Sequence, residues 1–302
     1  MTTTEELVTR GSSLPLNNYP GLSQSQATEY LLHRLKSVGG QPCGDLKKCG
    51  GFVQGLSWDS SLLGMNCGRV DFASALDPTA ANELACSAIK VAAAQNIQHL
   101  SVRFDSRDAG LIEAFSNNHF NKVDSISTYT VGVNEKTKTA YDEHVRLAQP
   151  SDSEAVAAIS YVAFTADRFH SDPLISKELA DNLHAEWGRN SILGKAADAV
   201  IVAIDEEKIV SFVTCKINQD LYNLTGYKLG TIVLVATAPE AQGRGFGKAT
   251  VKGAMAWFAD QGCHGIDVGT QASNFGAQKL YEGLGFRPSA SWTSLRCWII
   301  ED

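Results

Sequence analysis

The chain has 302 residues, of which 44% are hydrophobic and 20% are charged, as in ordinary globular proteins. Such a length can form one large domain or two modest ones, each with a real core. The net charge of −7 argues against nucleic acid as the main partner, because that partner requires a basic surface to displace counterions from phosphates.

The sequence predicts neither a membrane segment nor an export signal. No apolar run reaches the roughly 18 residues of a membrane span, and the N-terminus MTTTEELVTRGSSLPL lacks the apolar centre of a signal peptide. The seven cysteines are odd in number and scattered, which is typical of reduced thiols. We therefore expect a cytoplasmic protein with no membrane partner.

One cysteine pair invites comparison with a zinc site. Cys43 and Cys49 follow His33, but no short Cys-x-x-Cys pair and no fourth ligand are in register with them. Unpaired structural thiols explain these cysteines better, and we expect no metal site.

Residues 1–50 form an N-terminal leader for which the sequence suggests no role. The first 25 or so residues are rich in Thr, Ser, Asn and Pro, which predicts a frayed segment. A short helix is expected over 24–37, with apolar residues on one side. Repeated Gly and Pro residues then predict an irregular, linker-like stretch.

Residues 51–135 have an α/β pattern. A helix opens at Asp77, which can cap it, and at Pro78, which suits its first turn. The expected strands are FVQGLSW, CGRVDFA, HLSVRFD and SISTYTVGV, with a second helix at DAGLIEAFSNNHF. Strands that alternate with helices indicate a mixed or parallel sheet covered by helices.

A second α/β region covers residues 144–302, after a charged connection. It starts with strand HVRLA, a helix capped by Ser151 or Asp152, and a second helix over about 176–189. Strands VIVAID and IVSFVTCKI follow as a hairpin joined at Glu206 and Glu207. A strand, a glycine-rich loop, a helix, a strand, a helix and a strand complete the region.

The glycine-rich loop runs from Gln242 to Gly247, between a strand and an amphipathic helix. The first N–H groups of a helix lack internal partners and lie at the positive end of its dipole, and glycines let a phosphate approach the backbone. The loop is therefore a predicted phosphate site. A plain tight turn between strand and helix is the alternative.

Two common phosphate motifs do not fit this loop. The dinucleotide fingerprint G-x-G-x-x-G requires glycine where the chain has Lys248 or Thr250. A P-loop requires glycine at Gln242 and Ser or Thr at Ala249.

The loop instead resembles the Q-x-x-G-x-G loop of the GNAT N-acetyltransferase superfamily. A second GNAT signature follows the strand at 265–268, namely Gln271, Ala272, Ser273, Asn274 and the helix AQKLYEGLGF, which contains Tyr281. The element order over 144–300 is also similar to that of this superfamily. The resemblance implies a GNAT fold, with a mixed central sheet flanked by helices, and acetyl-CoA or a related acyl-CoA as co-substrate.

The two α/β regions repeat one another when 166 is added to each number of the first. The matched positions are Asp108 with Asn274, Ile112 with Gln278, Phe115 with Tyr281, and Phe120 with Phe286. The alternative is that any two strand-helix-strand units look alike. Because the first copy lacks a glycine loop and most of the polar stripe, we expect residues 51–135 to form a degenerate GNAT-like lobe and 144–302 the catalytic domain.

The resemblance implies how an acyl-CoA is held. Loop amides bind its pyrophosphate, the preceding strand pairs with pantetheine, and a backbone N–H near Val235 polarises the carbonyl. Arg244 and Lys248 are charge partners for the phosphates, with surface solvation as the alternative. The expected cofactor-binding residues are Val235, Ala236, Thr237, Gln242, Gly243, Arg244, Gly245, Phe246, Gly247, Lys248 and Asn274.

Tyr281 is the predicted general acid and Asn274 a second catalytic residue, which orients pantetheine or the acid. A tyrosine with a pKa of roughly 10 stays protonated at neutral pH and can donate to a thiolate with a pKa near 8.5. The alternative for Tyr281 is a core tyrosine. An acyl-cysteine route is disfavoured, because no His-Asp constellation accompanies the cysteines to lower a thiol pKa.

The acceptor side is read from the segment 163–187, where Arg168, Phe169, His170 and Trp187 are predicted to contact the substrate. His170 is a candidate base, although such a histidine is more often a solvated polar residue. This segment, a start at Ser57 and Trp58, and the final helix resemble the TDP-fucosamine acetyltransferase type, which acetylates a nucleotide-linked amino sugar. The leader is extra relative to that type.

The expected partner is therefore a small-molecule amine, with a nucleotide-linked amino sugar as the first hypothesis. An amino acid, a polyamine or another amine is the alternative acceptor, and a non-catalytic acyl-CoA sensor is the alternative class of protein. A homodimer is left open.

Overall fold

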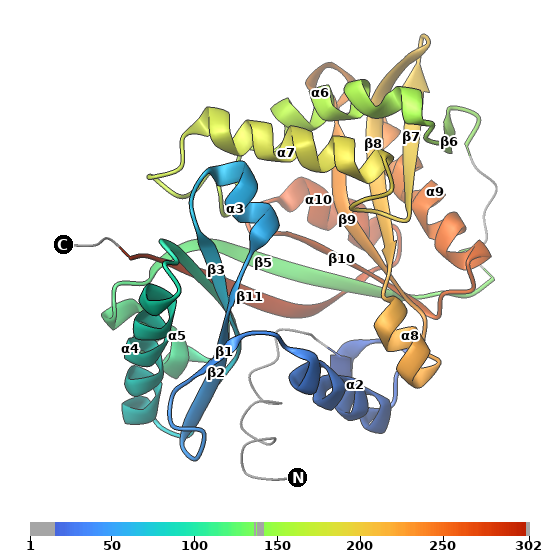
Figure 1. The fold of residues 1–302 in the computed structure, drawn as a ribbon. Coiled ribbons are helices and arrows are strands. Elements are labelled where there is room, and N and C mark those ends of the chain that lie inside the picture. Colours follow the sequence, from blue (N-terminus) through green and yellow to red (C-terminus); the bar gives the residue numbers. More distant parts are fainter. Residues whose placement is uncertain (1–15, 136, 138–141, 300–302) are drawn as a thin grey trace. The chain divides into compact units, whose positions relative to one another are not determined.

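The computed structural model describes residues 16–135, 137 and 142–299 (Figure 1). Of the described residues, two compact units are formed, the first mainly by 23–127 and 290–299 and the second by 18–22 and 128–289. Residues 290–302 were expected in the C-terminal domain, but β11 (Arg287–Trp298) pairs along seven residues with β4 (His99–Asp105) of the first unit. Within the described ranges, no helix is both long and apolar enough to span a membrane.

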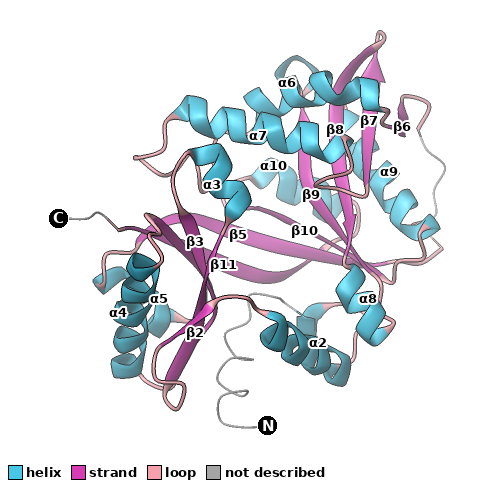
Figure 2. Ribbon diagram, in the orientation of Figure 1, coloured by secondary structure: helices cyan, strands magenta, loops and turns pink. Residues whose placement is uncertain are grey.

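The first unit has a mixed sheet with strand order β1-β2-β3-β4-β11-β5. Its strands are β1 (Gln41–Cys43), β2 (Cys49–Gly55), β3 (Cys67–Ala75), β4, and the parts of β5 (Asn121–Gly132) and β11 that lie in this unit. Its helices are α2 (Gln24–Ser37), α3 (Ser57–Leu63), α4 (Pro78–Ala94) and α5 (Ala109–Asn117) (Figure 2). Alanines of α4 such as Ala85 and Ala88 are fully buried, and their small side chains let this helix pack closely on the core.

The second unit has strand order β5-β10-β9-β8-β7-β6. Its strands are β6 (Val145–Leu147), β7 (Ala199–Asp205), β8 (Lys208–Ile217), β9 (Leu229–Thr237), β10 (Gly265–Gln271) and the end of β5. Its helices are α6 (Ser153–Ala163), α7 (Lys177–Ile192), α8 (Gln219–Thr225), α9 (Phe246–Asp260) and α10 (Phe275–Gly283), with short 3-10 turns at Pro150–Asp152 and Pro239–Ala241.

Helices cover both faces of this second sheet. Along β7, Ile201 packs into a core that includes α9 and α10, whereas its neighbour Val202 packs into a core that includes α6 and α7. Successive strand residues point to opposite faces, so the two helix pairs lie on opposite sides of the sheet. The expected mixed sheet flanked by helices is confirmed.

The repeat at a spacing of 166 residues has matching local geometry. Asp108 caps α5 and Asn274 caps α10, each accepting from the backbone N–H three residues further on. Each helix then ends in a residue of positive φ, which is His119 in the first copy and Gly285 in the second. The strands before these helices also agree, since β3 pairs in parallel with β4, as β9 does with β10, over four residues.

Several local predictions were wrong. The segment after residue 15 is not frayed, because Leu16 and Tyr19 are buried; the earlier residues lie outside the described ranges. The expected linker after α2 contains β1 and the start of β2. The strand expected to reach Trp58 ends at Gly55, and helix α3 follows, closed by Gly64 in the left-handed conformation.

Two further differences concern helix ends. Helix α8 was missed, although Asn218 caps its start and the left-handed Gly226 ends it, which are usual signals. Asp152 was one of two expected caps for α6 but makes no cap hydrogen bond. Its carboxylate instead accepts from the Arg146 guanidinium at 2.7 Å and from the Gln149 N–H at 2.7 Å.

Candidate functional site

The central strands of the second unit separate at one end. β9 and β10 pair in parallel from Leu229 with Gly265 to Ile232 with Val268. β9 nevertheless continues to Thr237 and β10 to Gln271, without further pairs between them. The outer half of β9 thus has one unpaired edge, to which an extended chain with amide groups can add as a strand does.

A bulge in β9 turns its N–H groups in defined directions. Between Val213 and Cys215 the pairing of β8 with β9 shifts, and there the Leu234 N–H donates to the Thr214 hydroxyl at 2.9 Å instead of to a strand carbonyl. The Ala238 N–H donates to the Val210 carbonyl at 2.8 Å. Because successive strand N–H groups alternate in direction, that of Val235 points away from β8, toward the unpaired edge.

The glycine loop ends at the N-terminus of α9. Gly243 and Gly245 have φ values of +75° and +93°, which glycine adopts without strain, and no atom lies within 4 Å of the position of a Cβ on either. Within the described part of the chain, no group accepts a hydrogen bond from the backbone N–H groups of residues 243–248. Together with the helix dipole, these free donors form a site suited to an anion.

Buried hydroxyls fix the loop to the end of β9. The Ser211 hydroxyl lies 2.9 Å from that of Thr237 and 3.2 Å from that of Thr250 in the first turns of α9. The Gln242 side chain donates to the Thr237 carbonyl at 3.2 Å. Gln242 thus holds the loop by its side chain and leaves the adjoining N–H groups free.

The two cations of the loop differ in their surroundings. The Arg244 guanidinium forms an ion pair with Asp205 at 2.6 Å and lies over the Phe246 ring at 5.0 Å. Lys248 is exposed, and among the described residues it has no ion-pair partner. Lys248 is therefore the freer of the two to meet a phosphate, and Arg244 can do so only by sharing its charge with Asp205.

Tyr281 is 3% exposed and lies in the core that also contains Val235 of β9. Its ring contacts Tyr129 and Phe286, with centroids 6.1 Å and 5.8 Å away. Burial raises the pKa of its hydroxyl, so the group stays protonated at neutral pH. The hydroxyl donates to no other described residue, so its proton is available to a ligand.

Asn274 and Gln278 precede Tyr281, the first as the N-cap of α10 and the second within the helix. The Asn274 carboxamide oxygen accepts from the Ala277 N–H at 3.1 Å, so this residue caps the helix. Gln278 donates to the Ala272 carbonyl at 2.8 Å and accepts from the Tyr129 hydroxyl at 3.2 Å. The cap gives Asn274 a structural function, and its predicted catalytic role stays a prediction.

The predicted acceptor residues lie in the connection before α7 and, for Trp187, in the second half of that helix. Phe169 is 3% exposed, and the Arg168 guanidinium lies over its ring at 4.5 Å. Trp187 lies beside the ring of His184, and His170 is held between Asp167 and Asp181. The reading of His170 as a solvated residue is wrong, because its side chain is 5% exposed.

Three buried cysteines, Cys215, Cys263 and Cys297, are poor nucleophiles and do not support an acyl-enzyme route. Burial raises the pKa of Cys215 well above its usual value and that of Cys263 to about 11, and burial also raises the pKa of Cys297. Because the thiolate is the nucleophile, these thiols are inert at neutral pH.

A separated strand pair, a bulged strand and an open glycine loop at a helix N-terminus lie together in the second unit, which has the order of elements of a GNAT fold. Residues 161–286 match the family model described as the acetyltransferase (GNAT) family. This match covers less than half of the chain and lies within the second unit.

Three comparisons illustrate its relationships. The chain is 27% identical over 150 residues to the spore coat polysaccharide biosynthesis protein SpsD of Bacillus subtilis strain 168. The aligned segment covers 50% of this chain and 49% of SpsD. The chain is also 41% identical over 58 residues to a mycothiol acetyltransferase of Pseudarthrobacter chlorophenolicus, over 19% of this chain and 18% of that one. The match thus spans about half the length of SpsD and less of the second relative.

A solved structure shares the fold across nearly the whole chain. The GCN5-related N-acetyltransferase from Sphaerobacter thermophilus is similar with a TM-score of 0.63 and 12% identity, covering 99% of this chain and 92% of that one. This similarity shows the fold alone.

Proposed function

We propose that the protein transfers the acetyl group of acetyl-CoA to a primary amine of a small molecule. The observation that carries this proposal is the row of unpartnered backbone N–H groups over residues 243–248, placed directly after the unpaired edge of β9. A phosphate group at the loop and a chain of amides along β9 are the two features that CoA combines. The match of residues 161–286 to the GNAT family model supports the same ligand.

Backbone and side-chain groups of this unit have different roles in the proposed reaction. The loop N–H groups bind the pyrophosphate, and the free edge of β9 pairs with the pantetheine amides. The Val235 N–H donates to the thioester carbonyl, where negative charge develops in the transition state. The neutral amine attacks the thioester carbon directly, the C–S bond breaks, and Tyr281 donates its proton to the departing thiolate. The nitrogen of the new amide loses its surplus proton to water, and Tyr281 is protonated again from the solvent.

For the acceptor, we propose an amino sugar on a nucleotide carrier. The similarity to SpsD, a protein named for polysaccharide biosynthesis, supports this choice. An amino acid, a polyamine or another amine remains the alternative, and a panel of such amines with thiol release as the readout distinguishes them. We expect the nucleotide-linked amino sugar to be turned over in preference to the other amines. Turnover of the other amines without turnover of the sugar would contradict the proposed acceptor.

The cofactor proposal is tested by calorimetric titration with acetyl-CoA. Gly245→Glu puts bulk and negative charge at the expected pyrophosphate position and should weaken binding at least 100-fold. Gly262→Glu is a matched control, because this glycine at the other end of α9 also has positive φ (+73°) and open space around its Cβ position. Both variants carry the same backbone strain, so unequal binding reports on the site.

Binding that is lost in Gly245→Glu and kept in Gly262→Glu supports the proposal. A wild-type protein that binds neither acetyl-CoA, propionyl-CoA nor free CoA would show that the loop is a structural turn. A protein that binds acetyl-CoA but releases no thiol with any amine would be the non-catalytic sensor.

A further inference from the structure

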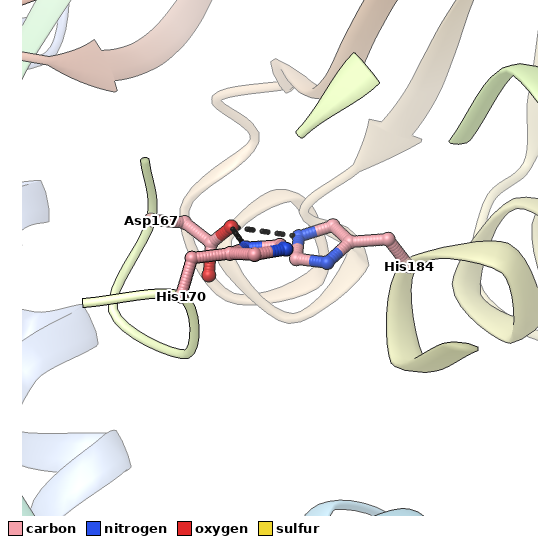
Figure 3. Close-up of side chains that lie close together, drawn as sticks. All are labelled: Asp167, His170 and His184. Carbon is pink, nitrogen blue, oxygen red and sulfur yellow. Dashed lines mark hydrogen bonds and ion pairs between the residues drawn. The ribbon is translucent and has the colours of Figure 1, made fainter. Parts of the chain in front are cut away.

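The loop before α7 and the middle of that helix bring two histidines and an aspartate together. Asp167, His170 and His184 each offer one nitrogen or oxygen atom, and these atoms lie within 4.8 Å of one another. Figure 3 shows the side chains of His170 and His184 both directed toward the carboxylate of Asp167. The three side chains are only 12%, 5% and 4% exposed, so water does not screen their interactions.

The tautomer of His184 follows from its neighbour. Its Nδ1 lies 2.9 Å from the Ala180 carbonyl oxygen, which can only accept a hydrogen bond, so Nδ1 carries the proton. A neutral ring then has a lone pair on Nε2. That atom lies 3.5 Å from Oδ2 of Asp167, so a lone pair meets a carboxylate oxygen with no proton between them.

His170 is arranged in the same way. Its Nε2 lies 3.0 Å from Oδ1 of Asp181, and the other oxygen of Asp181 accepts from Lys177 at 2.6 Å. Its Nδ1 faces the same Oδ2 of Asp167, at 2.5 Å. Each ring is thus fixed from outside by an acceptor, Asp181 or Ala180, and presents its inner nitrogen to Asp167.

This pattern is the one found around metal ions. A histidine that binds a metal usually donates its second ring N–H to a carboxylate or a backbone carbonyl, which fixes the tautomer. Here both histidines have such a partner. A proton on His170 can bridge this residue to Asp167, but it leaves the lone pair of His184 facing the carboxylate. A cation at the centre can accept a lone pair from both inner ring nitrogens and from the carboxylate at once.

We propose that Asp167, His170 and His184 bind one divalent transition-metal ion of the Zn²⁺ class. Two imidazoles and a carboxylate are a donor set that Zn²⁺ accepts, with a fourth tetrahedral position left for another ligand. Ligand atoms on a tetrahedral zinc lie roughly 3.4 Å apart. The 3.5 Å between Asp167 and His184 already fits, and the Asp167–His170 contact must widen by roughly 1 Å as the ion replaces the bridging proton.

The ion would link the connection between α6 and α7, residues 164–176, to helix α7 itself. Asp167 and His170 lie in that connection, and His184 is two turns into the helix. Arg168 and Phe169, two of the predicted acceptor residues, lie between the two ligands of the connection. The scheme above needs no metal for acetyl transfer, but a bound ion would take up the Nδ1 lone pair of His170, which then could not act as a base. The proposal differs from the expectation of no metal site.

The test uses the full chain without a polyhistidine tag, stripped with a chelator and dialysed. Titration with Co²⁺ should give visible ligand-field absorption that saturates at one ion per chain and disappears when Zn²⁺ is added. Elemental analysis should then find one zinc per chain. A wild-type protein with no such absorption and less than about 0.1 zinc per chain would overturn the proposal and leave a hydrogen-bonded network.

Variants identify the ligands. His184→Gln and Asp167→Asn should each weaken Zn²⁺ binding at least 100-fold, and Asp181→Asn, which removes only the outer partner of His170, by about 10- to 100-fold. His33→Gln removes an exposed histidine and should bind as wild type does. Unchanged binding in both ligand variants would overturn the assignment even if the wild type binds metal. Circular dichroism establishes that each variant is folded, and the wild-type Co²⁺ spectrum does not depend on any variant.

Discussion

The hydroxyl of Thr214 sets the bulge on which the proposed carbonyl-binding N–H depends. It is a fully buried acceptor for the Leu234 N–H at 2.9 Å, at the point where the pairing of β8 with β9 shifts. Thr214→Val keeps the shape of the side chain and removes this acceptor. The Leu234 N–H is then buried without a partner, since its position in the bulge gives it no strand carbonyl.

An unsatisfied buried donor costs about 1–3 kcal/mol. For a unit of this size, each kcal/mol lowers the melting temperature by about 2–4 °C. Thr214→Val should therefore melt roughly 2–12 °C below wild type. Because Val235 follows Leu234, its N–H should also lose its alignment, and kcat should fall by about 10- to 1000-fold while the KM for acetyl-CoA changes little.

The measurements are thermal unfolding and steady-state thiol release on the same preparations. Thr214→Ser is the control, because it keeps the hydroxyl and loses one methyl group, and it should retain most of the kcat. A valine variant that melts within about 1 °C of wild type and keeps its kcat would refute the role of this hydrogen bond in shaping β9.

Three further predictions concern other buried groups. Tyr281→Phe should lower kcat by about 100-fold or more with unchanged acetyl-CoA affinity, and equal turnover would remove the acid assignment. Burial raises the pKa of Asp267, so the ionised carboxylate destabilises the wild-type fold as the pH rises. Asp267→Asn should therefore raise the melting temperature at pH 7, and this increase over wild type should be smaller near pH 4. Asp260→Asn, at an exposed position, is the control. Burial also raises the pKa of Cys263 to about 11 and of Tyr227 to about 12, so the unfolding free energy should fall from about pH 9 upward. Urea titrations at increasing alkaline pH measure this free energy, and a value that does not change with pH would contradict the prediction.

The glycine loop and the second signature could be predicted from the sequence because each is a local pattern. Gly243 and Gly245 adopt the left-handed conformation for which glycine is needed, and the capping role of Asn274 follows from its place before a helix. The hairpin at Glu206 and Glu207 was also found, and both residues have positive φ there.

The features that the sequence did not predict depend on contacts between residues that are far apart in the chain. Thr214 is an ordinary strand residue in the sequence, and only its register against Leu234 reveals the bulge. The pairing of Arg244 with Asp205 joins a loop to a hairpin 39 residues earlier. The surroundings of His170 likewise depend on the packing of its loop against α7, so its burial could not be read from local polarity.

The two copies of the repeat also differ in whether a side chain caps the helix at which the second copy has its proposed anion site. Helix α4 of the first copy begins with Asp77, whose carboxylate accepts from the Ala80 N–H at 2.9 Å. Pro78, the first residue of that helix, has no N–H to offer.

The negative charge that a ligand would bring to the helix N-terminus is thus already supplied by the chain itself. In the second copy, Gly245 stands at the corresponding cap and has no side chain, so the donors of α9 stay free. The proposed acid Tyr281 has no counterpart in the first copy, where Phe115 stands at the matched position and packs its ring edge-to-face against Phe104 and Phe120. At the positions where the second copy has the groups of the proposed site, the first copy therefore has groups that stabilise its own helix and core.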